Sequence, residues 1–412
     1  MLDLLVRNVR IEGETTSVDV AVNDGKIVDR GLALDYGAAQ EMDGNGRLLI
    51  PGFVESHLHL DIALMNDWET PGRPEPYVSH YGLNAALERR RRQFTAEGIE
   101  QRASKALEMA SRHGVTALRA QCHVDREVGL KHVEVLQGVK EKYADQVTVQ
   151  IVTFPQQGLI NHPDNAALFR EAFRIGADVM GGASNLDVMG NGGIDWRSHI
   201  DAAFELAMDL NVDLDIHADL GLPSTVTLDE LETVYIAQQT IERGYQGRVT
   251  VGHACTLGVA TPDVAVEAIT LIQEARLNII SQPDLYRLGR EDTHNVRRGL
   301  TRVKELLAAG VNVTYASNNV RDALRPMGNF DLLEEGLILA YGAHMDTVDE
   351  LNTILRMSTY NAAQALRLPN YGLEPGCTAD FVILDAPSPS AAIIGQVEKI
   401  LVVKNGRIVA AN

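Results

Sequence analysis

Cysteine is scarce: the 412 residues include three, Cys122, Cys255 and Cys377, which lie far apart along the chain. An odd number of dispersed thiols argues against a disulfide framework, and no two of them have zinc-finger spacing. Long apolar runs are also missing, so we expect no segment that spans a bilayer. The first residues alternate apolar and polar side chains and lack the apolar core of a signal peptide. These absences predict a cytoplasmic protein.

Positive charge is also in deficit. Lysine and arginine together number 37 against 56 aspartates and glutamates, which gives a net charge of -19 at pH 7. Nucleic acids and anionic membranes repel such a surface, so we expect neither as a partner. Hydrophobic residues at 45% and charged residues at 23% are ordinary for a globular protein, and the length suits one large domain plus a smaller one.

Both ends of the chain have the pattern of short β-strands. Near the N-terminus, alternating segments flank the sequence NDG at residues 23–25, which favours a hairpin turn because these residues tolerate positive φ. Near the C-terminus, the strand-like segments ADFVILD and ILVVKNGRIVAAN follow, the second folded at an Asn-Gly pair. We therefore predict a small β-sandwich domain formed from residues 1–50 and 365–412, and a second domain over residues 51–364.

The middle of the chain alternates apolar, strand-like segments with amphipathic helical ones. This alternation implies parallel pairing, and eight repeats fit a (β/α)8 barrel, which takes about 250 residues. An open doubly wound sheet is the alternative, but no glycine-rich phosphate loop follows the first strand. The predicted strands are 48–60, 115–122, 147–153, 178–182, 212–217, 248–253, 277–281 and 311–317.

Histidines gather at the predicted carboxyl ends of the strands, where barrel enzymes place their active sites. His57 and His59 are one residue apart, so they share a face at the end of the first strand. His217 and His253 end two later strands. A single strand-end histidine is more often structural, but this set predicts a metal site, and imidazole suits zinc or ferrous iron. Other polar residues at predicted strand ends are His123, Gln156, Asn318 and Asn319.

The segments PGFVESHLHLD, FPQQG, DLDIHAD, TVGHA and ASNNVRD together resemble the amidohydrolase superfamily. More closely, they are similar to its cytosine deaminase and N-isopropylammelide amidohydrolase group, over nearly the whole chain. The resemblance implies one divalent metal ion, zinc or iron with manganese also possible, held by His57, His59 and His217. The metal would activate water against a C–N bond of a small heterocyclic substrate. It further implies a homo-oligomer.

Further roles follow from the same resemblance. His253 would polarise the attacked carbon or the bound water, and Gln156 would bind the substrate. The remaining candidate substrate-binding residues are His123, Asn319, Leu220 and Leu324.

The chain departs from the family pattern at three of these positions. Asn318 stands where the family has a metal-binding aspartate that takes a proton from water. Its amide oxygen can still bind the metal, so Asn318 is a fourth candidate ligand, but this oxygen carries no charge and accepts no proton. Leu220 replaces the glutamate that shuttles protons, and Leu324 replaces a tryptophan. Asp219 is the nearest substitute for the missing acid-base group. Other carboxylates near predicted strand ends are Asp61, Asp125, Asp284 and Asp322.

Two functions remain open at this point. The first is a metal-dependent hydrolase of altered chemistry that acts on a cyclic amide or amidine other than cytosine, because Leu220 and Leu324 make the pocket less polar. The second is a catalytically impaired, deaminase-like protein that binds a ligand, or an enzyme whose site has been substituted.

Overall fold

The computed structural model describes residues 1–412 with the exception of 67–79, 163, 189–191, 284–298 and 412. Its centre is a single sheet of eight parallel strands in chain order, from β6 to β13. A parallel bridge between Leu58 and Asn318 joins the first strand to the segment after the last, so the sheet closes into a barrel. The predicted (β/α)8 barrel is confirmed, and the open doubly wound sheet is wrong. The strands are β6 (Phe53–Leu58), β7 (Val115–His123), β8 (Thr148–Phe154), β9 (Val179–Ala183), β10 (Asp213–Ala218), β11 (Val249–His253), β12 (Asn278–Ser281) and β13 (Asn312–Tyr315).

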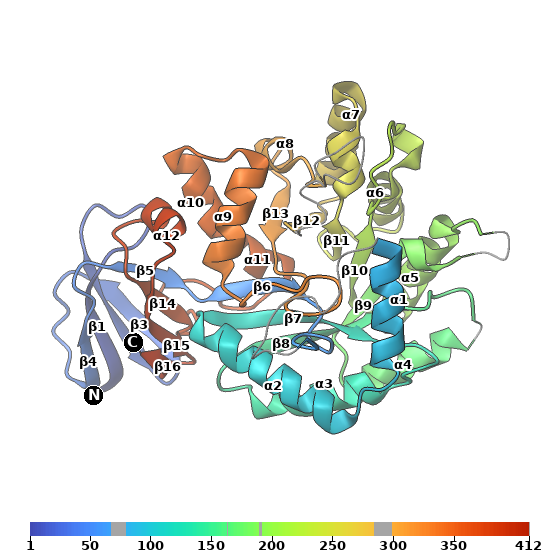
Figure 1. Cartoon of the computed structure of the whole chain (residues 1–412). Helices are drawn as coiled ribbons and strands as arrows, with labels where there is room; N and C mark the ends of the chain where they lie inside the picture. The colour runs from blue at the N-terminus through green and yellow to red at the C-terminus, as the bar shows by residue number, and fades with distance from the viewer. Residues whose placement is uncertain (67–79, 163, 189–191, 284–298, 412) are drawn as a thin grey trace.

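Helices lie around the barrel, with α9, α10 and α12 toward the side where the terminal sheets pack (Figure 1). Helix α2 shows why they form: the Thr95 side chain accepts the backbone N–H of Gly98, and buried residues such as Ile99, Ala103 and Leu107 recur at helical spacing. The helices are α1 (His80–Arg91), α2 (Ala96–Arg112), α3 (Lys131–Lys142), α4 (Asn165–Ile175), α5 (Trp196–Leu210), α6 (Glu232–Glu242), α7 (Pro262–Glu274), α8 (Val303–Ala308), α9 (Leu332–Ala343), α10 (Val348–Met357), α11 (Tyr360–Ala365) and α12 (Pro389–Gly395).

The two termini build a β-sandwich beside the barrel, as predicted (Figure 1). One sheet has the order β3-β2-β1-β4 and the other β16-β15-β14-β5, and side chains such as Val20 and Phe381 pack between them. The hairpin turns at Gly25 and Gly406, both at positive φ, approach so closely that a Cβ on Gly406 would lie 3.0 Å from the Gly25 Cα. The strands are β1 (Leu2–Val9), β2 (Val18–Asn23), β3 (Lys26–Gly31), β4 (Ala38–Asp43), β5 (Leu48–Pro51), β14 (Phe381–Leu384), β15 (Lys399–Lys404) and β16 (Arg407–Ala411).

The predicted single strand 48–60 is wrong, because the chain changes sheets at Gly52. β5 ends at Pro51 and pairs with β14 of the sandwich, whereas β6 starts at Phe53 and pairs with β7 of the barrel. A Cβ on Gly52 would lie 2.2 Å from the side chain of Thr116, so the crossing point requires glycine. The domain boundaries at residues 50 and 365 stay predictions.

Within the described ranges, no helix combines the length and the apolar character needed to cross a membrane. The expected cytoplasmic location and the homo-oligomer stay predictions.

A buried ion pair lies inside the barrel. Arg119 on β7 and Asp215 on β10 are 1% and 0% exposed, and the Arg119 Nη1 atom lies 3.1 Å from Asp215 Oδ2. The guanidinium makes further hydrogen bonds to Gln150 Oε1, Thr250 Oγ1 and the Ala365 carbonyl, so its five N–H groups have acceptors. Arg119 thereby ties four barrel strands to the C-terminal end of α11.

Replacing Arg119 with methionine should destabilise the fold strongly, because it leaves the Asp215 carboxylate buried without its cation. We expect the free energy of unfolding in urea to fall by about 3–5 kcal/mol. The control is Arg170→Met, which removes a pair with Asp209 in which both side chains are about half exposed; this variant should lose about 0–1 kcal/mol. Equal, small losses in the two variants would contradict the role given to Arg119.

Candidate metal centre and active site

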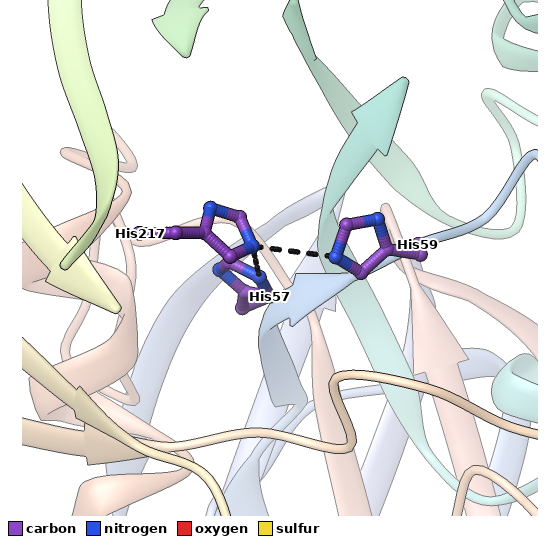
Figure 2. Close-up of side chains that lie close together, drawn as sticks. All are labelled: His57, His59 and His217. Atoms are coloured by element: carbon purple, nitrogen blue, oxygen red, sulfur yellow. Dashed lines mark hydrogen bonds between the residues drawn. The ribbon is translucent and has the colours of Figure 1, made fainter. Parts of the chain in front are cut away.

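Three histidines converge at the carboxyl end of the barrel. His57 lies on β6, His59 follows that strand directly, and His217 lies on β10. The Nε2 atom of His217 is 3.0 Å from His57 Nε2 and 3.3 Å from His59 Nε2 (Figure 2). All three side chains are buried, at most 5% exposed. The structure thus brings together the three residues that the sequence analysis named as metal ligands.

The chemistry of this cluster fits a divalent cation. A neutral imidazole carries one N–H, so three Nε2 atoms that face one another cannot all be paired among themselves. Four-coordinate zinc, with Zn–N bonds of about 2.0–2.1 Å, would set neighbouring ligand nitrogens roughly 3.3 Å apart. Burial lowers the pKa of His59 to about 3 and holds the pKa values of His57 and His217 well below their usual range. The three imidazoles are therefore neutral at pH 7, the form that binds metal.

A polar column supports the cluster from inside the barrel. His57 Nδ1 lies 3.2 Å from the Gln121 amide and 3.7 Å from Asp215 Oδ1, and Gln121 also donates to that carboxylate. Burial raises the pKa of Asp215, while Arg119 opposes the shift. Such outer contacts orient a ligand histidine.

A pocket opens above the histidine cluster. Besides His59 and His217, its lining includes seven other residues that the sequence analysis had named: His123, Gln156, Leu220, His253, Asn318, Asn319 and Leu324. Sequence reasoning missed a further set, namely Ile62, Leu87, Phe154, Ala183, Asn185 and Leu186. Phe154 ends β8 and Ala183 ends β9, so extending the search to one residue past each predicted strand finds both. Ile62 and Leu87 pack together with Leu324 nearby, which makes one wall apolar.

Two pocket residues sit where the backbone turns to positive φ. Asn318 has a φ of +57°, in the left-handed region that asparagine tolerates better than most residues. His253 and Ala254, at the end of β11, have φ values of +76° and +48°. Consecutive non-glycine residues in this region carry strain, which is characteristic of functional sites.

His123 is held between a carboxylate and the pocket. Asp61 Oδ2 lies 2.7 Å from His123 Nδ1 and 2.6 Å from His132 Nδ1, and it also accepts the backbone N–H of His123. The other ring nitrogen of His123 lies 3.2 Å from Gln156 Oε1. Burial opposes it, but the two histidines hold the pKa of Asp61 well below its usual range. Sequence reasoning missed His132, which comes from α3 and has no strand-end position to mark it.

Asp219 does not face the pocket as a substitute acid-base group. Its Oδ1 accepts the backbone N–H of Glu232 and its Oδ2 accepts the backbone N–H of Thr233, at 3.0 and 2.9 Å. A φ of +55° turns Asp219 toward these donors at the start of α6. Burial raises the pKa of Asp219, and burial together with Asp219 raises the pKa of Glu232 to about 7. The geometry therefore supports a helix-capping role for Asp219, and its catalytic role stays a prediction.

The other strand-end carboxylates are also engaged. Asp125 binds Arg91 at 2.6 Å, and Asp322 accepts the Asn319 amide at 2.6 Å. Asp284 lies outside the described residues.

Comparisons with known proteins agree with this architecture. The sequence profile described as the Amidohydrolase family matches residues 72–410. N-isopropylammelide isopropyl amidohydrolase of Pseudomonas sp. strain ADP is 30% identical over 99% of this chain and 97% of its own.

Two solved structures are similar over their full length. The 5-methylcytosine deaminase of Klebsiella pneumoniae has a TM-score of 0.89 at 29% identity and covers 99% of this chain and 98% of its own. N-isopropylammelide isopropylaminohydrolase of Burkholderia multivorans has a TM-score of 0.86 at 28% identity, covering 100% and 99%. Because both the profile and a relative cover most of the sequence, this chain belongs to the amidohydrolase family and is an enzyme of that family.

Proposed function

We propose that this enzyme is a metal-dependent hydrolase that cleaves a C–N bond of a nitrogen heterocycle, by deamination or by hydrolysis of a cyclic amide or amidine. The observation that carries the proposal is the convergence of the Nε2 atoms of His57, His59 and His217 beside a partly apolar pocket. The names of the relatives, an amidohydrolase of N-isopropylammelide and a deaminase of 5-methylcytosine, agree with this class of reaction.

Each pocket residue has a role in this proposal. One zinc, iron or manganese ion, held by His57, His59 and His217 with Asn318 as a further oxygen donor, would supply a water of lowered pKa as the nucleophile. His253, which lines the pocket, exchanges a proton with the attacked ring or the leaving nitrogen. Gln156, His123 and Asn319 orient the substrate by hydrogen bonds.

The pocket also suggests which heterocycles are accepted. Leu220 and Leu324 stand with Ile62 and Leu87 on the lining, so a polar ring edge would be desolvated there without a partner. We therefore propose that cytosine is a poor substrate and that a bulkier or more apolar heterocycle is preferred.

One observation favours a second candidate function. Among the described residues, no carboxylate lines the pocket, and positions 220 and 318 carry leucine and asparagine. General acid-base catalysis by a positioned side chain accelerates a reaction by a factor of about 10²–10⁴. A deaminase-like protein that binds a heterocycle without hydrolysing it would have the same pocket. Metal analysis together with a screen of cyclic amides, amidines and triazines on the metal-loaded protein separates the two functions.

Replacing His217 with asparagine should abolish metal binding, because the ligand whose Nε2 lies near both of the others is lost. We expect elemental analysis to find about one equivalent of zinc, iron or manganese in the wild type and almost none in the variant. Added metal should raise the melting temperature of the wild type but not that of His217→Asn. His344→Asn, at an exposed helix end, is the control and should keep its metal. Full metal content in His217→Asn would rule out this centre.

Gln156→Leu should impair substrate binding and leave metal binding intact. The amide faces the pocket beside His123, and leucine of similar size removes its donors and acceptor. We expect KM to rise about tenfold or more, since a buried polar edge of the substrate loses its partner. Unchanged kinetics on every accepted substrate would show that Gln156 does not contact it.

Introducing carboxylates at positions 318 and 220 together should raise the rate of deamination by more than the two single substitutions combined. Asn318→Asp tolerates the same positive φ and places an anionic oxygen near the histidine cluster, so metal affinity should increase. Leu220→Glu supplies a proton shuttle on the pocket wall. Because both groups act on one proton path, the rate gain of the double variant should exceed the product of the single gains.

Metal stoichiometry and deamination of cytosine-like heterocycles are measured for all four proteins. A wild type that binds metal fully and turns over faster than Asn318→Asp would mean that Asn318 suits a different reaction.

A further inference from the structure

Asn319 presents a buried amide to the pocket. Its side chain is 0% exposed, and it lies just beyond the end of β13 on the pocket lining. Its Nδ2 atom donates to Asp322 Oδ2 at 2.6 Å. Its Oδ1 atom is buried and has no hydrogen-bond partner among the described residues. An unsatisfied buried acceptor is costly, so a ligand in the pocket that offers a donor to this oxygen would gain a hydrogen bond.

Asp322 fixes the orientation of this amide. The carboxylate is itself buried, and its Oδ1 accepts the backbone N–H groups of Leu324 and Arg325, both at 2.9 Å. An ionised carboxylate has acceptors only. Turning the Asn319 amide over would set its oxygen against Asp322 Oδ2, so the NH2 group must face Asp322.

Another pocket amide, Gln156, has no such carboxylate partner among the described residues to fix its orientation. Its neighbour at 3.2 Å is the ring nitrogen His123 Nε2, which accepts when the ring carries one proton, held on Nδ1 by Asp61, and donates when the ring carries two. Gln156 can therefore meet a donor or an acceptor on the ligand, whereas Asn319 cannot.

We infer that Asn319 is a specificity-determining residue whose Oδ1 accepts a hydrogen bond from an N–H group of the substrate, with Asp322 as its positioning residue. The inference rests on the proposed function and narrows its substrate class to heterocycles that carry an amino or ring N–H at this edge. A ligand with a lone pair there is rejected, because two acceptors would face each other in a buried site.

The test uses pairs of s-triazines. The two compounds of a pair are identical except that one carries an amino group and the other a methoxy group at the same ring carbon. One pair is made for each substitutable ring carbon. Dissociation constants are measured by equilibrium dialysis of the metal-loaded protein, and chromatography confirms that the ligand is recovered intact. At the position that faces Asn319, the wild type should bind the amino compound about 10- to 100-fold more tightly. Asn319→Leu should reduce this ratio to about threefold or less, because neither compound then finds a partner.

The variant Asp322→Asn tests whether Asp322 acts by orienting the Asn319 amide or only by supporting the local structure. The amide that this substitution introduces at position 322 can both donate and accept, so the Asn319 amide is free to turn and offer its NH2 group. This variant should bind the methoxy compound more tightly than the wild type does, a gain that simple damage to the pocket does not produce. Asn185→Leu is the control: Asn185 lines the same pocket but is half-buried, so water satisfies either end of its amide and the ratio should persist.

The melting temperature of each variant checks that it is folded. Equal binding of the amino and methoxy compounds by the wild type, at every ring position, overturns the inference and leaves the proposed function standing. Binding of neither compound, with metal present, overturns the proposed function and the inference with it.

Discussion

Two backbone hydrogen bonds at Asn318 close the barrel beside the histidine cluster. The Asn318 N–H donates to the His57 carbonyl, and the His59 N–H donates to the Asn318 carbonyl, both at 2.9 Å. These bonds join the first barrel strand to the segment after the last, at the level of the histidines themselves. The positive φ of Asn318 makes the join possible, so barrel closure and the spacing of the proposed ligands depend on the same residue.

The buried ion pair nearest to the histidine cluster lies on the barrel-interior side of it, and the pocket lies on the other side. The Arg119–Asp215 pair occupies the barrel interior and reaches His57 through Gln121. The guanidinium satisfies the buried carboxylate, and the imidazoles above remain neutral because burial disfavours their charged form. A site of neutral nitrogen ligands on a charged but balanced support can accept a divalent cation without first releasing protons.

Carboxylates near the pocket orient other groups and do not line it in the described part of the chain. Asp61 orients His123, Asp219 caps α6, and Asp322 orients Asn319. The pocket therefore relies on imidazoles, amides and apolar side chains. Under the proposed function, this distribution leaves substrate recognition to amides such as Gln156 and Asn319 and to the apolar wall.

Local patterns in the sequence were enough to predict the terminal sandwich, the barrel with most of its strands, and a metal site among strand-end histidines, because alternation and strand-end position are properties of neighbouring residues. The choice of His57, His59 and His217 as the ligands came from the resemblance to the amidohydrolase superfamily. Tertiary contacts decided the rest. The need for glycine at the change of sheet comes from Thr116 on the neighbouring strand β7, and the direction of the Asp219 side chain depends on the N–H groups at the start of α6. Which amide atom of Asn319 faces the pocket was likewise undetermined by residue type, since an asparagine side chain is nearly symmetric in shape and only a buried partner such as Asp322 distinguishes its two ends.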